Sequence, residues 1–314
     1  MKVFSFSAIQ SLHISPLDCE AWVDDALRHK HLAILPAKTS LKPEIDEVFY
    51  NTMPVILPFA GYAGVKEVTR YPTRNPSLDS QILLYDLNTG EQLAFMDGNW
   101  ITAMRTGAVA AHAVHLLANP DYSVIGMVGL GNTARSALLT IQAMNPDREI
   151  TVKLMEYKNQ HELFAARFSA FSNLHFEFCQ TPAQMAKGSQ VILSAATVLR
   201  EDICTDDCFD EGVLVVPIHT RGFTNCDLFF DKVFADDVNH VRGFRYFSRF
   251  RRFAETAEVL RGEKPGREDP RERILAYNIG IAMHDIYFAG KIYEMAKDAA
   301  PELDFKAPKE KFWI

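Results

Sequence analysis

The sequence predicts a mixed α/β protein in which a doubly wound parallel sheet is joined to an α+β domain. Three observations lead to this fold class. From Tyr122 onward, short apolar runs alternate with helical stretches, a glycine-rich turn follows the first of these runs, and the first hundred residues instead have the pattern of antiparallel strands. At 314 residues, the chain is long enough for two domains, each with its own core.

The first hundred residues predict a small antiparallel sheet. Residues 64–71 alternate like a strand, and residues 81–97 have the pattern of two strands joined by a turn around residues 88–90. An alanine-rich helix is expected after Asp97 and Gly98, with Arg105 in its first turn. This domain is therefore distinct from the one that follows it.

The segment 123–134 joins an apolar strand to a glycine-rich turn and a helix. Gly129, Gly131 and Ala134 fit the dinucleotide-binding fingerprint, in which the glycines allow a tight turn and close approach to a pyrophosphate. A helix that starts near Asn132 would direct its free N–H groups at the phosphates. The alternative is a chance glycine turn in another α/β unit.

The next predicted strand, 150–156, ends in an acidic residue, Glu156. At this position a carboxylate accepts hydrogen bonds from an adenosine ribose and repels a 2′-phosphate. The sequence therefore predicts NAD(H) as the cofactor, in preference to NADP(H).

The remaining apolar runs complete the predicted parallel sheet. Near-continuous apolar strands separated by helices are typical of a sheet buried on both faces, whose ligand lies beyond the carboxyl ends of the strands. The further strands are expected at 174–178, 190–194, 213–218 and 232–235, and the helices near 132–144, 159–171, 181–187 and 225–230.

After Pro270, apolar residues recur at spacings of three and four and predict one long helix that packs back on the first domain. They are Ile274, Tyr277, Ile281, His284, Phe288, Ile292 and Met295. The domain boundaries are accordingly expected at 1–118 with 271–314, and at 119–270.

The composition argues against several classes of protein. A formal net charge of −7 disfavours a nucleic-acid partner, because neutralising phosphates requires a basic surface. No run of about 18 apolar residues and no obvious secretion signal is present, so we expect a cytoplasmic protein without a membrane span. Cys204 and Cys208 lie among acidic residues, but no second Cys or His pair completes a metal site, and no metal is expected.

Arg105 is a candidate ligand for an anion. A cation near a helix N-terminus is unfavourable unless an anion lies beside it, and a guanidinium suits a carboxylate. The alternative is a solvated arginine on a helix surface. Small residues at positions 107, 108, 110 and 111 predict the close approach of another backbone or of a ligand.

Lys66 and Asp227 are two further candidates. Lys66 lies in an apolar run between glycines and could bind a substrate carboxylate or tune the protonation of an imine; the alternative is a surface lysine on an edge strand. Asp227 follows the strand at 213–218, so we expect it near the carboxyl edge of the sheet, where a substrate would lie. A helix-capping role is the alternative.

The segment 242–253 mixes arginines with aromatic residues, a pattern sometimes found in RNA-binding proteins. Acidic residues lie just upstream, and no RNA-binding module surrounds the segment. A solvated amphipathic surface is the favoured interpretation.

Ordered motifs along residues 36–295 resemble the ornithine cyclodeaminase/μ-crystallin family. They are Thr52-Met-Pro54, Gly64-Val-Lys66, Thr89-Gly-Glu91, Asp97-Gly98, Thr102-x-x-Arg105-Thr106, the glycine turn, Ala196-Thr197, Asp227 and Asn278-x-Gly280-x-Ala282 with Asp285. The resemblance implies a central Rossmann-type domain, a substrate and dimerisation domain built from both chain ends, and a homodimer.

The resemblance also implies roles for individual residues. Arg105 and Lys66 match residues that hold the substrate α-carboxylate, with Lys38 where members often have a second arginine, and Asp227 matches the catalytic acid/base. Gly129, Gly131, Asn132 and Thr133 would surround the pyrophosphate, Glu156 the ribose, Thr197 the nicotinamide side, and Asn278 the nicotinamide carboxamide.

The implied chemistry is hydride transfer at the α-carbon of an amino or imino acid. The leading interpretation is an ornithine cyclodeaminase, which converts L-ornithine to L-proline and ammonia. The alternatives are a cyclic ketimine reductase acting on pyrroline-2-carboxylate, an amino-acid dehydrogenase, a synthase that joins an amine to a keto acid, and a crystallin-like protein that binds nucleotide and a small ligand with little turnover.

Three positions depart from the family pattern. Asn51 stands where ornithine-specific members have a glutamate near the distal amine, and a neutral amide cannot neutralise an ammonium. Thr133 replaces a common glutamine. His219 follows the fifth strand where members have a small residue, and it could transfer protons or simply pack.

Overall fold

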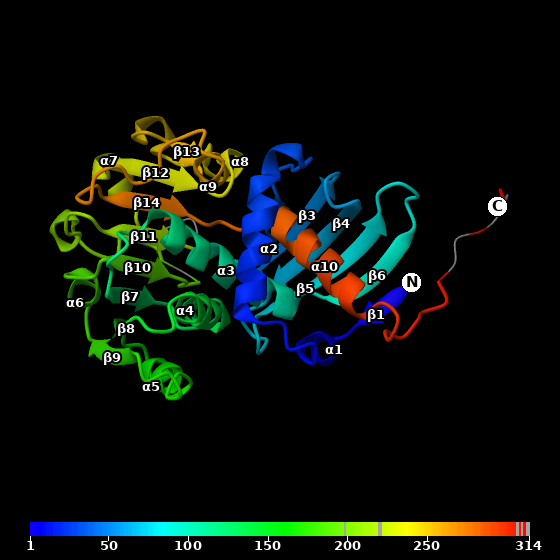
Figure 1. Cartoon of the computed structure of the whole chain (residues 1–314), viewed down its shortest axis with the longest axis horizontal. Helices are drawn as coiled ribbons and strands as arrows, with labels where there is room; N and C mark the ends of the chain where they lie inside the picture. Colours follow the sequence, from blue (N-terminus) through cyan, green and yellow to red (C-terminus); the bar gives the residue numbers. More distant parts are fainter. Residues whose placement is uncertain (198, 219–221, 306–307, 309, 312–314) are drawn as a thin grey trace. The chain divides into compact units, whose positions relative to one another are not determined.

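The structure is a computed structural model, and it describes residues 1–197, 199–218, 222–305, 308, 310 and 311 (Figure 1). It divides into two compact units. The first unit comprises Met1–Ile14, His31–Thr102 and Ala282–Ile314, and the second comprises Ser15–Lys30 and Ala103–Ile281.

Within the described part of the second unit, eight parallel strands form one sheet in the order β13-β12-β14-β11-β10-β7-β8-β9. The strands are β7 (Val124–Val128), β8 (Ile150–Met155), β9 (Leu174–Cys179), β10 (Val191–Ser194), β11 (Leu214–Pro217), β12 (Lys232–Ala235), β13 (Ala254–Glu255) and β14 (Ile274–Tyr277). The helical segments are α2 (Pro16–Arg28), most of α3 (Asn99–Leu117), α4 (Asn132–Met144), α5 (Gln160–Ala166), α6 (Pro182–Ala186), η2 (Asp206–Cys208), α7 (Cys226–Phe229), α8 (Val238–Val241), η3 (Phe247–Arg249) and α9 (Thr256–Leu260).

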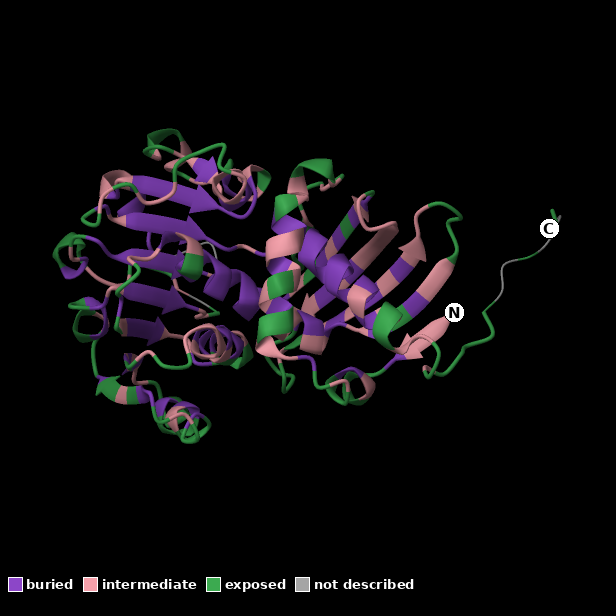
Figure 2. Ribbon diagram, in the orientation of Figure 1, coloured by how far each residue is buried: buried purple, intermediate pink, exposed green. Residues whose placement is uncertain are grey.

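This sheet is buried on both faces. Every residue of β10, β11, β12 and β14 is buried (Figure 2). Successive residues enter different core clusters, with Val191 and Leu193 in one and Ile192 in the other. Helices therefore cover both faces, and the predicted doubly wound parallel sheet is confirmed.

The six strands expected between residues 123 and 235 are all present, but the predicted helix after Pro270 is wrong at its start. Residues 274–277 form strand β14, and the helix α10 (Ala282–Ala296) begins only at Ala282. An apolar run of four residues is too short for its periodicity to separate a buried strand from a helix. Gly280, with a φ of +86°, then turns the chain between the strand and the helix.

In the described part of the first unit, six strands form a second sheet in the order β1-β6-β5-β4-β3-β2. The β5–β6 hairpin and strand β4 lie where the sequence predicts them. Strands β3, β4, β5 and β6 are antiparallel to one another, whereas β1 pairs with β6 in parallel. The elements are β1 (Lys2–Phe4), α1 (Phe6–Gln10), η1 (Lys30–Leu32, at a boundary between the units), β2 (Thr39–Leu41), β3 (Phe49–Leu57), β4 (Tyr62–Arg70), β5 (Leu78–Asp86), β6 (Gln92–Asp97) and α10.

Helix α10 covers one face of this sheet, as expected for a helix that packs back on the first domain. Two glycines allow the close approach. A Cβ on Gly64 would lie 2.5 Å from Cδ1 of Ile286, and one on Gly290 would lie 2.5 Å from the ring of Tyr62. The opposite face carries alternate residues of β3, β4 and β5 and remains partly exposed.

Helix α3 begins at Asn99, too early for Arg105 to lie in its first turn. The carboxylate of Asp97 accepts a hydrogen bond from the N–H of Asn99 at 2.9 Å, which starts the helix at that residue. With about 3.6 residues per turn, Arg105 lies in the second turn, so its expected place in the first turn is wrong.

The unit boundaries differ from those expected at residues 118/119 and 270/271. The units change at Thr102/Ala103, within α3, and at Ile281/Ala282, and the segment 15–30 belongs to the second unit. The physical reason for the last difference is that α2 packs on α4 and α9, and that Lys30 pairs with Asp237 and Glu255 at 2.7 Å each.

Among the described residues, no helix is long and apolar enough to cross a membrane.

Candidate functional site

The turn after β7 has the backbone shape that the fingerprint requires. Gly129 has a φ of +78°, and a Cβ there would collide with the backbone of Ala196 in the loop after β10. Gly131 is the N-cap of α4 and makes no side-chain capping bond; a Cβ added to it would meet nothing within 4 Å. Open space therefore adjoins the uncapped N-terminus of a helix of 13 residues, an arrangement that suits a phosphate group.

The other residues expected to bind the nucleotide follow neighbouring strands of the parallel sheet. Asn132 and Thr133 open α4, Glu156 directly follows β8, and Thr197 follows β10. Glu156 is partly exposed, and its backbone N–H donates to Cys179 O at 2.9 Å. Since all strands of the sheet are parallel, these residues lie at one edge of it, at the carboxyl ends of the strands.

Asp227 lies in α7, which follows β11, and its side chain is 1% exposed. Its Oδ1 accepts a hydrogen bond from the hydroxyl of Tyr277 at 2.8 Å, whereas Oδ2 has no hydrogen-bond partner in the described part of the chain. Burial raises the pKa of the carboxyl to about 7; the bond from Tyr277 opposes this rise, and the charge of Asp202 adds to it. Such a pKa suits a group that gives and takes a proton near neutral pH.

Asn278 directly follows β14 and is 1% exposed. Its backbone N–H donates to Pro217 O at 2.9 Å, at the end of the neighbouring strand β11. Both Oδ1 and Nδ2 lack a hydrogen-bond partner among the described residues. Leaving a buried amide unsatisfied is costly, so this side chain is suited to a ligand that offers both a donor and an acceptor, as a carboxamide does.

Arg105 is buried, with 5% of its surface exposed, so the solvated-arginine alternative is wrong. A Cβ on Gly280 would lie 2.7 Å from Nη1 of Arg105 and 3.2 Å from Nη2. The N–H of Gly280 in turn donates to Oδ2 of Asp236 at 2.6 Å, at the end of β12. The missing side chain at position 280 thus leaves the space that the guanidinium occupies.

In the first unit, Lys66 is buried in the middle of the sheet rather than exposed on an edge strand, so the surface alternative is wrong. Its Nζ lies 2.7 Å from Oδ1 of Asp285 on α10 and 3.5 Å from the hydroxyl of Thr102. Lys66 is 1% exposed and Asp285 0%. The charge of Lys66 is therefore already paired with a carboxylate of the same unit.

Two more expected substrate residues lie in the first unit. Asn51, on β3, is buried, and its Oδ1 has no hydrogen-bond partner among the residues described. Lys38 is partly exposed and precedes β2. His219, the third departure from the family pattern, lies outside the described residues.

The structure also decides two other interpretations. The small residues of α3 accommodate another backbone, since a Cβ on Gly107 would collide with Ser136 of α4. In the segment 242–253, Phe244, Phe247, Phe250 and Phe253 pack inward, and the arginines are exposed, as expected for an amphipathic surface. Within the described residues, no group of three or more His, Cys, Asp or Glu side chains could hold a metal ion.

Sequence reasoning assigned no role to four residues that complete these clusters: Asp236, Tyr277, Gly280 and Asp285. Gly280 and Asp285 already stood in a recognised motif, and the residues paired with them were named as candidates. The apolar spacing predicts a helix at Tyr277, so no feature of the sequence indicates its pairing with Asp227.

Comparisons with known proteins give matches over most of the chain. A model of the ornithine cyclodeaminase/mu-crystallin family matches residues 3–300. The chain is 26% identical over 277 residues to ketimine reductase mu-crystallin of Macropus fuliginosus, covering 83% of this chain and 85% of the relative. It is 26% identical over 306 residues to alanine dehydrogenase of Archaeoglobus fulgidus, covering 90% and 92%.

Among solved structures, the chain is similar to the Δ1-pyrroline-2-carboxylate reductase of Thermococcus litoralis in complex with NADH and L-proline. The TM-score is 0.85 at 25% identity, over 96% of this chain and 100% of that one. An archaeal alanine dehydrogenase dimer with bound NAD has the same fold, with a TM-score of 0.85 at 23% identity over 98% of this chain and 99% of that one.

Proposed function

Because the chain belongs to the ornithine cyclodeaminase/mu-crystallin family, we propose that it is an NAD(H)-dependent oxidoreductase acting at the α-carbon of an amino or imino acid. The observation that carries the proposal is Asp227, a buried carboxyl with a raised pKa at the carboxyl edge of a dinucleotide-binding sheet. Asp227 gives a proton to the substrate nitrogen or takes one from it. Arg105 binds the substrate carboxylate and orients the α-carbon.

The residues at the carboxyl edge fit NAD(H). When bound, this cofactor supplies or accepts the hydride. The open space at Gly131 and the uncapped start of α4 are suited to the pyrophosphate, and Glu156 to the adenosine ribose. The buried amide of Asn278 is suited to the nicotinamide carboxamide, with which it can exchange two hydrogen bonds.

Among the possible reactions, we favour reduction of a cyclic imino acid such as pyrroline-2-carboxylate. Asn51 is a neutral amide and cannot neutralise the distal ammonium of ornithine, whereas a cyclic imine carries no such group. The similarity to the Thermococcus litoralis reductase supports the same choice. Ornithine cyclisation is the second candidate, because Oδ1 of Asn51 is a buried acceptor without a partner among the described residues.

Two assays on the purified protein separate these reactions. Pyrroline-2-carboxylate with NADH is followed by the loss of NADH absorbance, and L-ornithine with catalytic NAD⁺ by release of ammonia and L-proline. We expect NADH consumption with the imino acid and none of the second reaction, and Asp227→Ala should abolish turnover. Proline and ammonia without net NADH formation would instead establish the cyclodeaminase. Nucleotide binding without turnover of any amino or imino acid would favour a binding protein.

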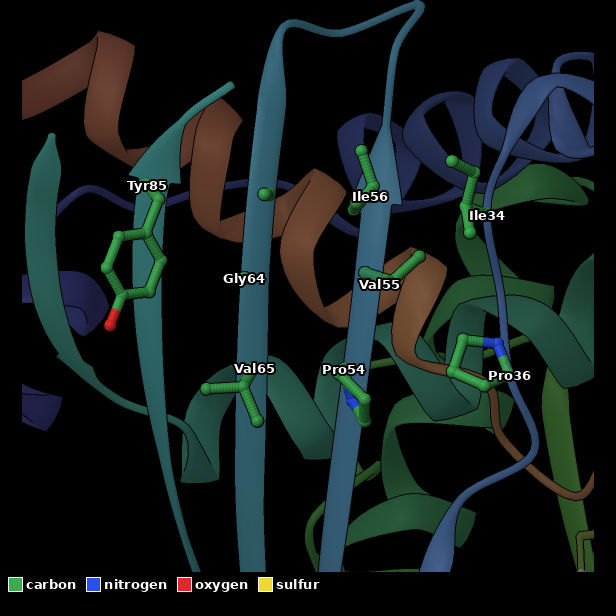
Figure 3. A pocket seen from close by; sticks show the side chains of 9 residues that line it. Ile34, Pro36, Pro54, Val55, Ile56, Gly64, Val65 and Tyr85 are labelled. Carbon is green, nitrogen blue, oxygen red and sulfur yellow. The ribbon is translucent and has the colours of Figure 1, made fainter. Parts of the chain in front are cut away.

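We further propose that the first unit binds substrate and forms a homodimer through the outer face of its sheet. Figure 3 shows this face, with Pro54, Val65 and Tyr85 on the side opposite α10. The face is apolar and contains a shallow hollow of about 370 Å³. Large hydrophobic side chains are exposed on the same unit, including Ile34 at 61% and Leu41 at 60%.

Exposed apolar surface of this kind is uncommon on monomers and suits a second copy of the chain. A charge in its centre, Val65→Asp, should shift the protein from dimer to monomer in sedimentation experiments. Ala170→Asp adds the same charge at an exposed position of the second unit and should leave the dimer intact. A wild-type monomer would contradict this proposal.

A further inference from the structure

Among the described residues, Tyr277 donates a hydrogen bond from its hydroxyl to the carboxylate of Asp227, at 2.8 Å. Tyr277 ends β14, and Asp227 lies in α7, so the bond joins two elements that are 50 residues apart in the sequence. Both side chains are buried, at 2% and 1% exposure. The bond occupies Oδ1 and leaves Oδ2 without a hydrogen-bond partner among the described residues.

We infer that Tyr277 is a positioning residue for Asp227: its hydroxyl fixes the carboxyl rotamer and thereby presents Oδ2 to the substrate nitrogen. The inference rests on the proposed function of Asp227 as the acid/base. A carboxyl group held through one oxygen cannot rotate freely, so the other oxygen keeps one direction.

The surroundings hold the Tyr277 ring in place. Phe244 meets the ring edge-on with centroids 5.1 Å apart, and Phe250 stacks on it at 6.1 Å with an interplanar angle of 17°. These aromatic neighbours belong to the segment 242–253, whose arginines are exposed. The packing of this segment thus has a consequence for the site, because it restricts the tyrosine that binds Asp227.

Tyr277 is the donor in its bond to the ionised carboxylate of Asp227. Burial raises the pKa of its hydroxyl well above the ordinary value, and the charge of Asp227 adds to the rise. The phenol is therefore protonated throughout the range in which Asp227 titrates. Because the bond favours the ionised carboxylate, it also opposes the effect of burial on the pKa of Asp227.

The other described titratable groups that influence this pair are few. Asp202, in the loop after β10, raises the pKa of Asp227 and of Tyr277. Cys226 precedes Asp227 in α7 and has a raised pKa itself, owing to burial first and then to the charges of Cys204, Asp227, Asp206 and Asp202. The segment η3, which packs on α7, contributes Arg249, which is exposed.

The test is Tyr277→Phe, which removes the hydroxyl and keeps the ring against Phe244 and Phe250. We expect the pH limb of kcat/KM that belongs to Asp227 to move upward by about one pH unit, because a hydrogen bond to a charged group contributes roughly this much. We also expect kcat to fall at least tenfold, since the carboxyl is no longer held, while NADH affinity stays unchanged. The substrate titrates identically in both proteins, so the displacement belongs to the enzyme.

Tyr122→Phe is the matched control. Tyr122 is also buried in the second unit, at 5% exposure, and its hydroxyl accepts a weak bond from Asn145 at 3.4 Å. It precedes β7 at the amino end of the sheet, away from the carboxyl edge. Loss of this hydroxyl should leave the pH profile and kcat as they are.

Direct observation of the carboxyl keeps the test decisive if Tyr277→Phe has no measurable activity. The carbonyl stretch of protonated Asp227 is identified in infrared spectra as the band that Asp227→Asn removes, and its midpoint is followed with pH. An unchanged midpoint in Tyr277→Phe, or an unchanged pH limb with full activity, would overturn the inference. A pH limb and activity that survive in Asp227→Asn would instead overturn the proposed function of Asp227.

Discussion

The ammonium of Lys66 lies 2.7 Å from the carboxylate of Asp285, and both side chains are withdrawn from solvent. The two residues are 219 positions apart, on strand β4 and helix α10 of the first unit. Burying either charge alone would cost several kcal/mol, on the order of the stability of a whole domain. Helix α10 therefore brings the counter-charge that allows a lysine in the middle of this sheet.

Removing one member of this pair should destabilise the protein strongly. We expect Asp285→Asn to lower the free energy of unfolding in urea by about 3–5 kcal/mol, because it removes the carboxylate that pairs with the buried ammonium of Lys66. Glu302→Gln is the control, since Glu302 is 3.6 Å from Lys2 in an exposed pair of the same unit. That change should cost less than about 1 kcal/mol. Equal losses of unfolding free energy in the two variants would show that the buried pair contributes no more to stability than the exposed pair.

Asp227 should make stability depend on pH in the direction opposite to most acids. Its pKa is about 7 in the fold, against an ordinary value of 3.8, so the protonated form is the one that folding favours. Its contribution is fully present below pH 3.8 and is lost as the pH rises through 7. Compared with the wild type, the free energy of unfolding of Asp227→Asn should therefore rise between pH 4 and pH 8, by up to a few kcal/mol. Thermal denaturation of both proteins at each pH measures this difference.

Asp210→Asn provides the control of sign for this measurement. The exposed carboxyl of Asp210 has a lowered pKa, chiefly because of its bond to Lys187, so its contribution is present at neutral pH and lost as the pH falls. The variant should be less stable than the wild type by a nearly constant amount between pH 4 and pH 8, and this difference should shrink only as the pH falls below about 3.8. If the difference between Asp227→Asn and wild type were constant with pH, the raised pKa of Asp227 would be refuted.

Gly280→Ala should weaken the binding of substrate through Arg105. The new methyl group would lie 2.7 Å from Nη1, so the guanidinium must move, and we expect KM for the carboxylate substrate to rise at least tenfold. Gly262→Ala separates this effect from backbone strain. Gly262 has a similar φ of +73° but open space around it, so its variant should lose only about 1–2 kcal/mol of stability and keep its KM. A normal KM in Gly280→Ala would contradict the role of Arg105.

The two glycines of the turn after β7 should respond differently to alanine. Gly129→Ala would collide with the backbone of Ala196 at a φ of +78°, so it should destabilise the second unit. Gly131→Ala meets nothing within 4 Å at a φ of −85°, so it should fold with nearly unchanged stability. We expect it to weaken NADH binding at least tenfold in fluorescence titrations, because the methyl group enters the space proposed for the pyrophosphate. Unaltered NADH affinity would place the phosphates elsewhere.

Local patterns account for the parts of the fold that the sequence predicted well. The turn at Gly129, the apolar strands of the second unit and the β5–β6 hairpin all follow from residues within about 15 positions of one another. The prediction was wrong where local information was too short. Residues 274–277 form a strand because β11 and β12 flank them in the sheet, and no feature of four apolar residues shows this.

The sequence by itself determined the fold class, the glycine turn and the identity of the candidate residues, because backbone propensities and ordered motifs depend on residues close together in the sequence. Only the tertiary structure decided what those residues contact. The pairs Lys66–Asp285 and Asp227–Tyr277, and the space that Gly280 leaves for Arg105, each join distant segments. Burial then sets their charges and directions, and burial is a property of the packed chain rather than of any segment of it.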